Sequence, residues 1–282
     1  MAVSMVELVE DLRAETLDLE RMLAPLDAAE WDTATPAPGW AVRDQVSHLA
    51  WFDDAAVRAL TAPEEFRAEV ATALAARGAE ALDTDDIAAR YRTLPVAEVH
   101  DWFDAARARL LDVLTGRPDA KILDARTRIP WYGPDMSAAS FVTARLMETW
   151  AHGQDIADAL GASRPPTDRL RHVAYIGVRA LPYSFAVRGR PAPAAPVRVE
   201  LTLPGGAALT FGPETAADVV RGGAFDFCLV VTRRRHLADV SLDATGPVAA
   251  EWLSIAQAFV GPPGAGRRPG QFPRRDGDLT GT

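Results

Sequence analysis

The fold is indicated most clearly by a helical pattern that contains the stretch Arg145-Leu146-Met147-Glu148-Thr149-Trp150-Ala151-His152-Gly153-Gln154-Asp155. This helix is predicted at residues 138–160, with Ser137 as a suitable N-cap and Gly161 as a natural stop. Apolar residues at helical intervals predict further helices at residues 6–23, 42–60 and 96–114, and an alanine-rich helical stretch at 63–92. Four long helices with apolar stripes predict a four-helix bundle, which we assign to residues 1–163.

Glu148 and His152 are four residues apart, so in a helix both leave the same face, one turn from each other. A carboxylate and an imidazole so placed can hold one divalent metal ion. His48, which shares a helical stripe with Gln45 and Phe52, is the best candidate for a third ligand. Two imidazoles and a carboxylate suit zinc, and also iron, nickel or manganese, with a position left open for water or substrate. The simpler alternative is a solvated Glu148–His152 pair and a structural His48.

The pattern changes after residue 163. Strict alternation of apolar and polar residues predicts a strand at 197–203, with a hairpin partner at 208–211 and a third strand at 217–220. Helices are expected at 168–181, 224–234 and 247–259. These elements predict a small α+β domain at residues 164–260, so the chain as a whole is mainly α. Residues 261–282 are rich in Gly, Pro, Arg and Asp, which predicts a disordered tail.

Composition excludes several classes of protein. The 282 residues carry a formal charge of −9 without a basic cluster in the folded region, so nucleic acid is not an expected partner. Neither a signal peptide nor an apolar run of about 20 residues is present, so no membrane association is expected. The single cysteine, Cys228, excludes an internal disulfide and favours a cytoplasmic location. Because it lies in an apolar run, we expect Cys228 to be buried and inert.

Other polar residues near the three candidate ligands are candidates for catalysis. Asp155, one turn beyond His152, and Asp44, four residues before His48, could each orient an imidazole or act as a base, or could simply be solvated. Arg145 could bind the carboxylate of a substrate or cofactor, or pair with Glu148 or Asp44.

Aromatic residues are candidates for the cofactor pocket. Trp40, Trp131 and Tyr132 are placed to line its mouth, although aromatics at such intervals also serve as ordinary core packing.

Two segments carry a family resemblance. The run 38–49 (Pro-Gly-Trp-Ala-Val-Arg-Asp-Gln-Val-Ser-His-Leu) resembles the Gly-Trp-x-Val-x-Asp-x-x-x-His-Leu signature of the DinB-like superfamily. The run 148–155 (Glu-Thr-Trp-Ala-His-Gly-Gln-Asp) is similar to the Glu-x-x-x-His-x-x-Asp motif of the mycothiol-dependent maleylpyruvate isomerase family. The resemblance implies a metal-binding bundle followed by a smaller sterol-carrier-like α+β domain, with the metal held by His48, Glu148 and His152.

The chain looks closer to an uncharacterised actinobacterial branch than to the isomerase itself, because of its Trp131-Tyr132-Gly133-Pro134 loop and the sequence of its 138–160 helix. The isomerase family also uses an arginine of the C-terminal domain. Arg221 and the run 233–235 are possible equivalents, but no motif fixes the match.

The expected function follows from the metal and the resemblance. We expect a divalent metal, with zinc first, and a mycothiol-like thiol to act on a small electrophilic substrate by transfer or isomerisation. The alternatives are a zinc-dependent hydrolase that uses metal-bound water, and a non-catalytic metal- or ligand-binding protein. The expected partners are the thiol and a small-molecule substrate, and the protein is expected to be a monomer or a homodimer.

Overall fold

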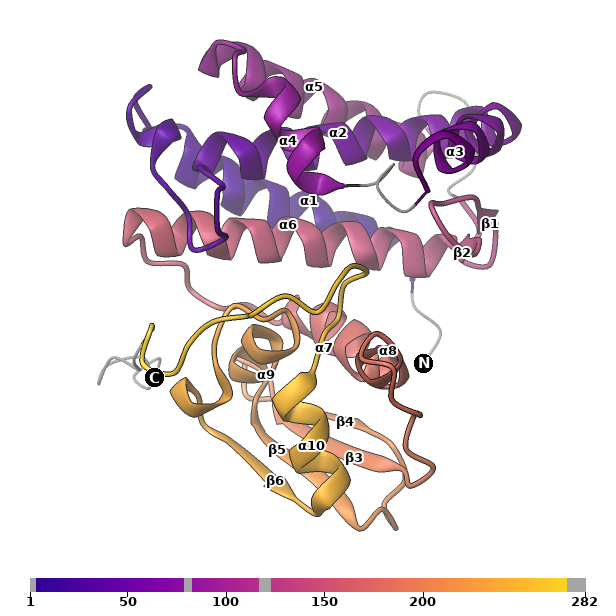
Figure 1. Cartoon of the computed structure of the whole chain (residues 1–282), viewed down its shortest axis with the longest axis vertical. Coiled ribbons are helices and arrows are strands. Elements are labelled where there is room, and N and C mark those ends of the chain that lie inside the picture. The colour runs from indigo at the N-terminus through magenta and orange to yellow at the C-terminus, as the bar shows by residue number, and fades with distance from the viewer. Residues whose placement is uncertain (1–3, 79–82, 117–122, 273–282) are drawn as a thin grey trace. The chain divides into compact units, whose positions relative to one another are not determined.

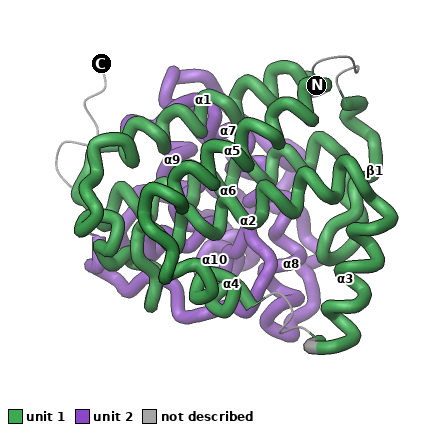
Figure 2. The backbone as a smooth tube through the Cα atoms, turned by 90° about the horizontal axis from the view of Figure 1, so that it is seen from above, with its two compact units in different colours: residues 1–164 green, residues 165–282 purple. Residues whose placement is uncertain are grey.

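The computed structural model describes residues 4–78, 83–116 and 123–272. The chain divides into two compact units, Met1–Arg164 and Pro165–Thr282, which are coloured separately in Figure 2. The predicted class is confirmed: a mainly helical chain with a helical bundle first and a small α+β unit second. The residues of the predicted metal triad all belong to the first unit.

Unit 1 is built on four long helices that lie alongside one another in Figure 1. They are α1 (Met5–Leu23), α2 (Val42–Thr61), α5 (Val96–Thr115) and α6 (Ala138–Leu160). Helix α2 packs against α5 and α6, and α1 packs against α6 and α5. The connections contain η1 (Glu30–Asp32), α3 (Pro63–Arg77), α4 (Thr84–Tyr91) and a hairpin of β1 (Arg128–Ile129) and β2 (Met136–Ser137). This is the bundle that the sequence predicted.

The ends of α6 follow from its capping residues, as predicted. The Oγ atom of Ser137 accepts a hydrogen bond from the backbone N–H of Ser140 at 3.2 Å, which satisfies one donor of the first turn. Gly161 ends the helix with φ of 62°, a left-handed conformation that glycine adopts without a steric penalty. The position of Glu148 and His152 in the middle of α6 is therefore set by local sequence.

One prediction for unit 1 was wrong in detail. The alanine-rich stretch 63–92 is not one helix, because Gly78 ends α3 with φ of 57° and Asp83 starts α4 by accepting hydrogen bonds from the N–H groups of Asp85 and Asp86. The Trp131-Tyr132-Gly133-Pro134 loop is confirmed, and it connects the strands of a short hairpin in which Ile129 pairs with Met136.

Unit 2 is a four-stranded sheet with helices. The strand order is β4-β3-β5-β6, with β3 and β5 parallel and the other pairs antiparallel. The strands are β3 (Val197–Thr202), β4 (Ala208–Phe211), β5 (Asp218–Gly223) and β6 (Leu242–Thr245), and the helical elements are α7 (Leu170–Arg179), α8 (Leu181–Ala186), α9 (Ala224–Val231), η3 (Leu237–Asp239) and α10 (Pro247–Ile255). In β3, Val199 and Leu201 are buried while Arg198 and Glu200 lie on the other face, as the alternation predicted.

Several elements of unit 2 differ from the predictions. Strand β6 was not predicted, since residues 242–245 are mostly exposed and show no apolar alternation. The helix expected at 168–181 is interrupted after Arg179, and α8 then begins with Pro182 in its first turn, a position that proline tolerates. The helices expected to reach residues 234 and 259 end at Val231 and Ile255.

The predicted disordered tail is only partly within the described residues. Residues 261–272 follow an irregular path with specific contacts, in place of the predicted disorder. Arg233 donates hydrogen bonds to the carbonyl oxygens of Pro263 and Gly264, and the N–H of Gly270 donates to Asp239 at 2.7 Å. Residues 273–282 lie outside the described part.

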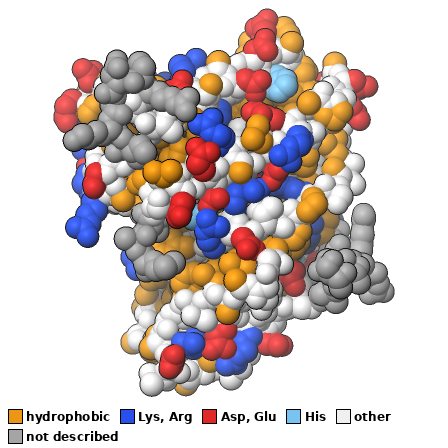
Figure 3. All heavy atoms as spheres, turned by 180° about the vertical axis from the view of Figure 1, so that it is seen from behind, with side chains coloured by type: hydrophobic (Ala, Val, Ile, Leu, Met, Phe, Trp, Pro, Cys, Tyr) orange, Lys and Arg blue, Asp and Glu red, His pale blue; other side chains and the backbone are white. Residues whose placement is uncertain are grey.

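The described part of the chain contains no helix that is both long and apolar enough to cross a membrane. On the face drawn in Figure 3, acidic and basic side chains are interspersed among apolar ones and do not form a single basic area.

Candidate metal centre

The side chains predicted to bind a metal lie together where α2 meets α6. The atoms that His48, Glu148 and His152 can offer to an ion lie within 4.8 Å of one another. Nε2 of His152 is 3.1 Å from Oε2 of Glu148, and Nε2 of His48 is 3.6 Å from the same oxygen. Two ligand atoms on a tetrahedral zinc ion, with bonds of about 2.1 Å, are roughly 3.4 Å apart. The observed separations lie on either side of this value, so these residues fit a divalent ion.

A chain of hydrogen bonds sets which nitrogen of His152 carries the proton. The hydroxyl of Thr35 donates to the carbonyl oxygen of Trp40 at 2.9 Å, and the Thr35 oxygen accepts from Nε2 of Gln45 at 2.8 Å. Gln45 therefore presents its Oε1 atom to Nδ1 of His152, which donates to it. In a neutral ring, Nε2 then carries a lone pair that faces the carboxylate of Glu148. Such a contact requires a cation, either a proton or a metal ion, between the two atoms.

The surroundings of His48 and Glu148 favour the protonation states that bind a metal ion. Burial, followed by the charge of His152, lowers the pKa of His48 from 6.5 to about 4. Burial alone raises the pKa of Glu148, but hydrogen bonds and charges from His152 and His48 outweigh it and hold this pKa well below 4.5. At neutral pH the centre therefore offers a neutral imidazole from His48 and an ionised carboxylate from Glu148, the forms that bind metal.

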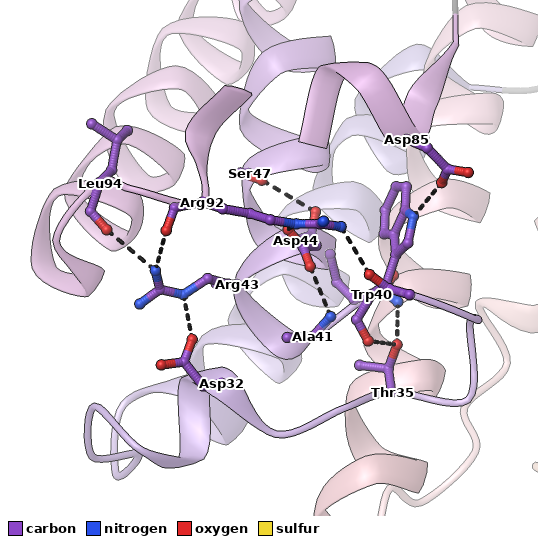
Figure 4. A network of polar contacts seen from close by, with 12 residues as sticks. Asp32, Thr35, Trp40, Ala41, Arg43, Asp44, Ser47, Asp85, Arg92 and Leu94 are labelled. Carbon is purple, nitrogen blue, oxygen red and sulfur yellow. Dashed lines mark hydrogen bonds and ion pairs between the residues drawn. The ribbon is translucent and has the colours of Figure 1, made fainter. Parts of the chain in front are cut away.

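Trp40 packs against both histidines. Its ring centroid is 5.3 Å from that of His48, and it is 6.0 Å from that of His152 with the planes only 18° apart. The indole N–H donates to Asp85 at 2.6 Å, which holds the ring in place (Figure 4). A residue predicted for the cofactor pocket thus contacts the candidate ligands and shields them from water.

Trp131 and Tyr132 are the other residues predicted for this pocket, and the ring of Phe52 lies between them and His48. Both contact Phe52, with ring centroids 6.1 and 6.0 Å apart, and Phe52 contacts the ring of His48 at 4.6 Å. Burial raises the pKa of Tyr132 to about 12, so its phenol stays protonated at neutral pH. These aromatic residues form one cluster with Trp51, Phe66 and Phe141.

Asp44 does not orient His48, contrary to one of its predicted roles. Its Oδ2 accepts the backbone N–H of Ala41 at 2.9 Å and caps the first turn of α2, and its Oδ1 accepts from Nε of Arg92 at 2.9 Å (Figure 4). Both oxygens are engaged in these structural contacts, and a role of Asp44 as a catalytic base stays a prediction.

Arg145 and Asp155 are both buried, at 4% and 1% exposure. The acid closest to Arg145 is neither Glu148 nor Asp44 but Asp53, whose Oδ1 lies 3.3 Å from the Nε atom of Arg145. Asp155 is not the hydrogen-bond partner of His152 Nδ1, because Gln45 occupies that position. The orienting role predicted for Asp155 therefore belongs to Gln45.

Gln45 and Phe52 share the helical stripe of His48 on α2, but the local sequence pattern assigns a function to neither. Their spacing from His48, three residues before and four after, places all three on one helix face and is the signal that could have identified them. The contact of Gln45 with His152 joins residues 107 positions apart, which no local pattern can predict.

The arginines considered in the C-terminal domain belong to unit 2. Arg221 donates to Glu200 at 2.7 Å across neighbouring strands, and Arg233 holds the 263–264 segment. Cys228 is fully buried, as predicted, and burial raises its thiol pKa well above 9.0.

Comparison with known proteins agrees with this architecture. Residues 12–157 match the family model of the mycothiol maleylpyruvate isomerase N-terminal domain. The uncharacterized proteins Rv0036c (strain ATCC 25618 / H37Rv) and MT0041 (strain CDC 1551 / Oshkosh) of Mycobacterium tuberculosis are each 47% identical over 259 residues, covering 92% of this chain and 97% of theirs.

Solved structures share the fold. The crystal structure of a mycothiol-dependent maleylpyruvate isomerase matches with a TM-score of 0.57 and 17% identity, over 88% of this chain and 96% of that one. A point mutant of the mycothiol-dependent isomerase matches over the same shares, with a TM-score of 0.56 and 16% identity. The family model matches more than half of the chain, and the relatives match over nearly their full length. This chain therefore belongs to the mycothiol maleylpyruvate isomerase N-terminal domain family.

Proposed function

We propose that the protein is a metal-dependent transferase or isomerase that uses a low-molecular-weight thiol of the mycothiol type on a small electrophilic substrate. Membership of a family named for a mycothiol-dependent isomerase and the clustering of His48, Glu148 and His152 support the proposal. Zinc suits this donor set best, and nickel, iron(II) and manganese accept the same donors.

The contact between Nε2 of His152 and the carboxylate of Glu148 is the observation that carries the proposal. Gln45 accepts the proton of the other ring nitrogen, so in a neutral ring two lone pairs face each other across 3.1 Å. A proton or a divalent ion resolves this repulsion, and His48 is at the right distance to complete a set of three protein ligands for the ion. Such a set leaves one coordination position open, as reactive metal sites do.

The residues around the centre have separable tasks. A divalent ion held there would lower the pKa of a bound thiol and supply a thiolate nucleophile at neutral pH. Glu148 contributes the one negative charge among the three ligands, so the loaded centre stays net positive and favours thiolate over thiol. Gln45 orients His152, and Trp40 excludes water from one side. The thiol must come from a small molecule, because Cys228 is buried and its pKa is raised.

In the proposed reaction, the thiolate forms a C–S bond to a double-bonded carbon while the electron pair moves onto a neighbouring electron-withdrawing group. For isomerisation, the former double bond rotates, the pair returns and the C–S bond breaks, which regenerates the thiolate. For transfer, a proton adds to the carbon that received the pair and the C–S bond remains. Neither outcome needs an oxidant or a reductant.

Metal analysis of the full-length protein tests the ligand set first. We expect one equivalent of metal in the wild type and loss of stoichiometric binding in His152→Ala. His100→Ala is the matched control, because this imidazole of the same unit contacts Trp31 and Asp104 and is not part of the triad. One equivalent of metal retained by His152→Ala would refute the ligand assignment.

Turnover tests the chemistry. On the cobalt(II)-loaded protein, an added thiol should produce thiolate-to-cobalt charge-transfer absorption, and consumption of an electrophile should require both thiol and metal. Turnover without thiol would support the metal-dependent hydrolase instead. Thermal stabilisation by a ligand without any turnover would support a binding protein.

A further inference from the structure

Arg145 is a buried cation whose hydrogen-bonding capacity is not used within the described residues. Its side chain is 5% exposed, and its Nε and Nη2 atoms have no hydrogen-bond partner there. Asp53 is the carboxylate nearest to Nε, at 3.3 Å, but the two groups form an ion pair without hydrogen-bond geometry. Buried guanidinium groups normally have their donors satisfied, so this one is available to a ligand.

Asp53 faces Arg145 with its Oδ1 atom, which makes no hydrogen bond, and is bonded through its other oxygen to a second arginine. Its Oδ2 accepts a hydrogen bond from Nε of Arg107 at 2.6 Å. The two terminal nitrogens of Arg107 donate one hydrogen bond each, Nη1 to the hydroxyl of Thr16 and Nη2 to that of Thr149. One carboxylate thus lies between two guanidinium groups, of which Arg107 is well bonded and Arg145 is not.

The position of Arg145 relates it to the candidate metal centre. It precedes Glu148 by three residues, so both lie on one face of α6. Its guanidinium carbon is 5.7 Å from the ring centroid of Phe52, which in turn is 4.6 Å from the ring of His48.

We propose that Arg145 binds the carboxylate of a small organic acid that occupies the metal centre, on the side covered by Phe52. The three candidate ligands carry one negative charge, that of Glu148, so a divalent ion leaves a net positive centre beside a second cation. A ligand with two anionic ends, one on the metal and one on Arg145, matches this pair of charges. The proposal rests on the metal centre of the proposed function and adds the chemical class of its ligand.

The test compares two thiols on the cobalt(II)-loaded protein. 3-Mercaptopropionate has a thiol and a carboxylate, whereas 2-mercaptoethanol has the thiol with a neutral end. Titration of the charge-transfer absorption gives the affinity for each. We expect wild type to prefer the acid by roughly tenfold to a hundredfold, as one charge-assisted hydrogen bond provides, and Arg145→Gln to lose that preference.

Two further variants control the result. Arg109→Gln removes an exposed arginine that pairs with Asp54 in the same unit, and it should keep the preference. Arg145→Lys keeps the charge without the planar guanidinium and should retain part of the preference, which allows a decision even where the glutamine variant fails to fold. Wild type without any preference, or Arg145→Gln with the full wild-type preference, overturns the proposal.

Failure of the thiol chemistry gives a different result. If neither thiol produces the absorption, the proposed function fails and the role of Arg145 is decided by calorimetry with propionate on the same metal-loaded proteins. Weaker propionate binding by Arg145→Gln than by wild type supports the proposal. Equal binding by the two proteins, or no binding by either, overturns it.

Discussion

Replacing Gln45 by leucine should weaken metal binding although every candidate ligand remains. Gln45 is fully buried; its Oε1 accepts the proton of His152 Nδ1 and its Nε2 donates to Thr35 at 2.8 Å. Leucine is similar in size but has neither polar atom. The His152 ring then loses the contact that selects one tautomer and one orientation, and the free nitrogen no longer always faces the metal position.

The size of the effect follows from the contacts that are lost. Outer partners of metal-binding histidines typically contribute about 10- to 100-fold to affinity, which corresponds to about 1.4–2.7 kcal/mol. The metal-free variant should also be less stable, because His152 and Thr35 each lose a buried hydrogen-bond partner at a cost of about 1–3 kcal/mol. Thr35 keeps its bond to the carbonyl of Trp40, so the total should be roughly 2–4 kcal/mol.

Competition between the protein and a chromophoric chelator for zinc measures the affinity, and urea denaturation of the metal-free protein measures the stability. Gln154→Leu is the matched control, because Gln154 is also buried and bonds to Asp158 at 2.9 Å. Gln45→Glu keeps an acceptor for His152 and should lose less affinity than the leucine variant. Wild-type zinc affinity in Gln45→Leu would refute the inference that this residue orients His152.

Other predictions concern single groups. Asp44→Ala should lower the free energy of unfolding by about 1–3 kcal/mol in urea denaturation, because it removes a helix cap and a partner of Arg92, yet it should leave zinc affinity unchanged. Reduced zinc affinity at normal stability would contradict this structural role. In the metal-free protein, the lowered pKa of His48 should reduce the free energy of unfolding by about 1.6 kcal/mol as the pH falls from 6.5 to 5. Its folded pKa, about 4, is below its unfolded value of 6.5, so in this window the unfolded chain binds the extra proton. Denaturation at several pH values checks this prediction, and an unchanged pH dependence in His48→Asn would disprove it. Cys228 should react with a thiol reagent only after unfolding, since burial raises its pKa; mass spectrometry after native labelling would detect the contrary.

Local sequence specified most of the bundle but not all of its connections. Helix α6 was predictable because Ser137 and Gly161 mark its ends and apolar residues recur between them. The stretch 63–92 was misread since its alanines favour a helix throughout, whereas Gly78 and Asp83 interrupt it. Strand β6 was missed because it lies at the edge of the sheet with mostly exposed side chains and therefore shows no alternating pattern.

The candidate site was predictable only as far as helix geometry and motif resemblance reach. The spacing of Glu148 and His152 places both on one face of α6 without tertiary information, while His48 was predicted from its helical stripe and from its motif. The neighbours of these residues depend on how α2 and α6 meet. For this reason Gln45 was passed over and the orienting role was given to Asp155, which is closer in sequence.

A single buried guanidinium connects the four long helices of the bundle. Arg107 of α5 donates to Asp53 on α2 at 2.6 Å, to Thr16 on α1, and to Thr149 on α6 at 3.0 Å. Its side chain is almost completely buried, at 2% exposure. A buried ion pair of this kind adds little net stability compared with apolar packing, because desolvation offsets most of the attraction.

Its value is better explained by the register that it imposes. Asp53 follows His48 by five residues on α2, and Thr149 directly follows Glu148 on α6, so bonds from one guanidinium group to both fix the two helices against each other close to the candidate ligands. Glu148 and His152 need no such help, because α6 itself sets their spacing. His48 comes from another helix, and a shift of α2 by one residue, about 1.5 Å, would exceed the tolerance of metal bonds of about 2 Å. We therefore infer that the buried polar network serves the geometry of the metal centre more than the stability of the fold.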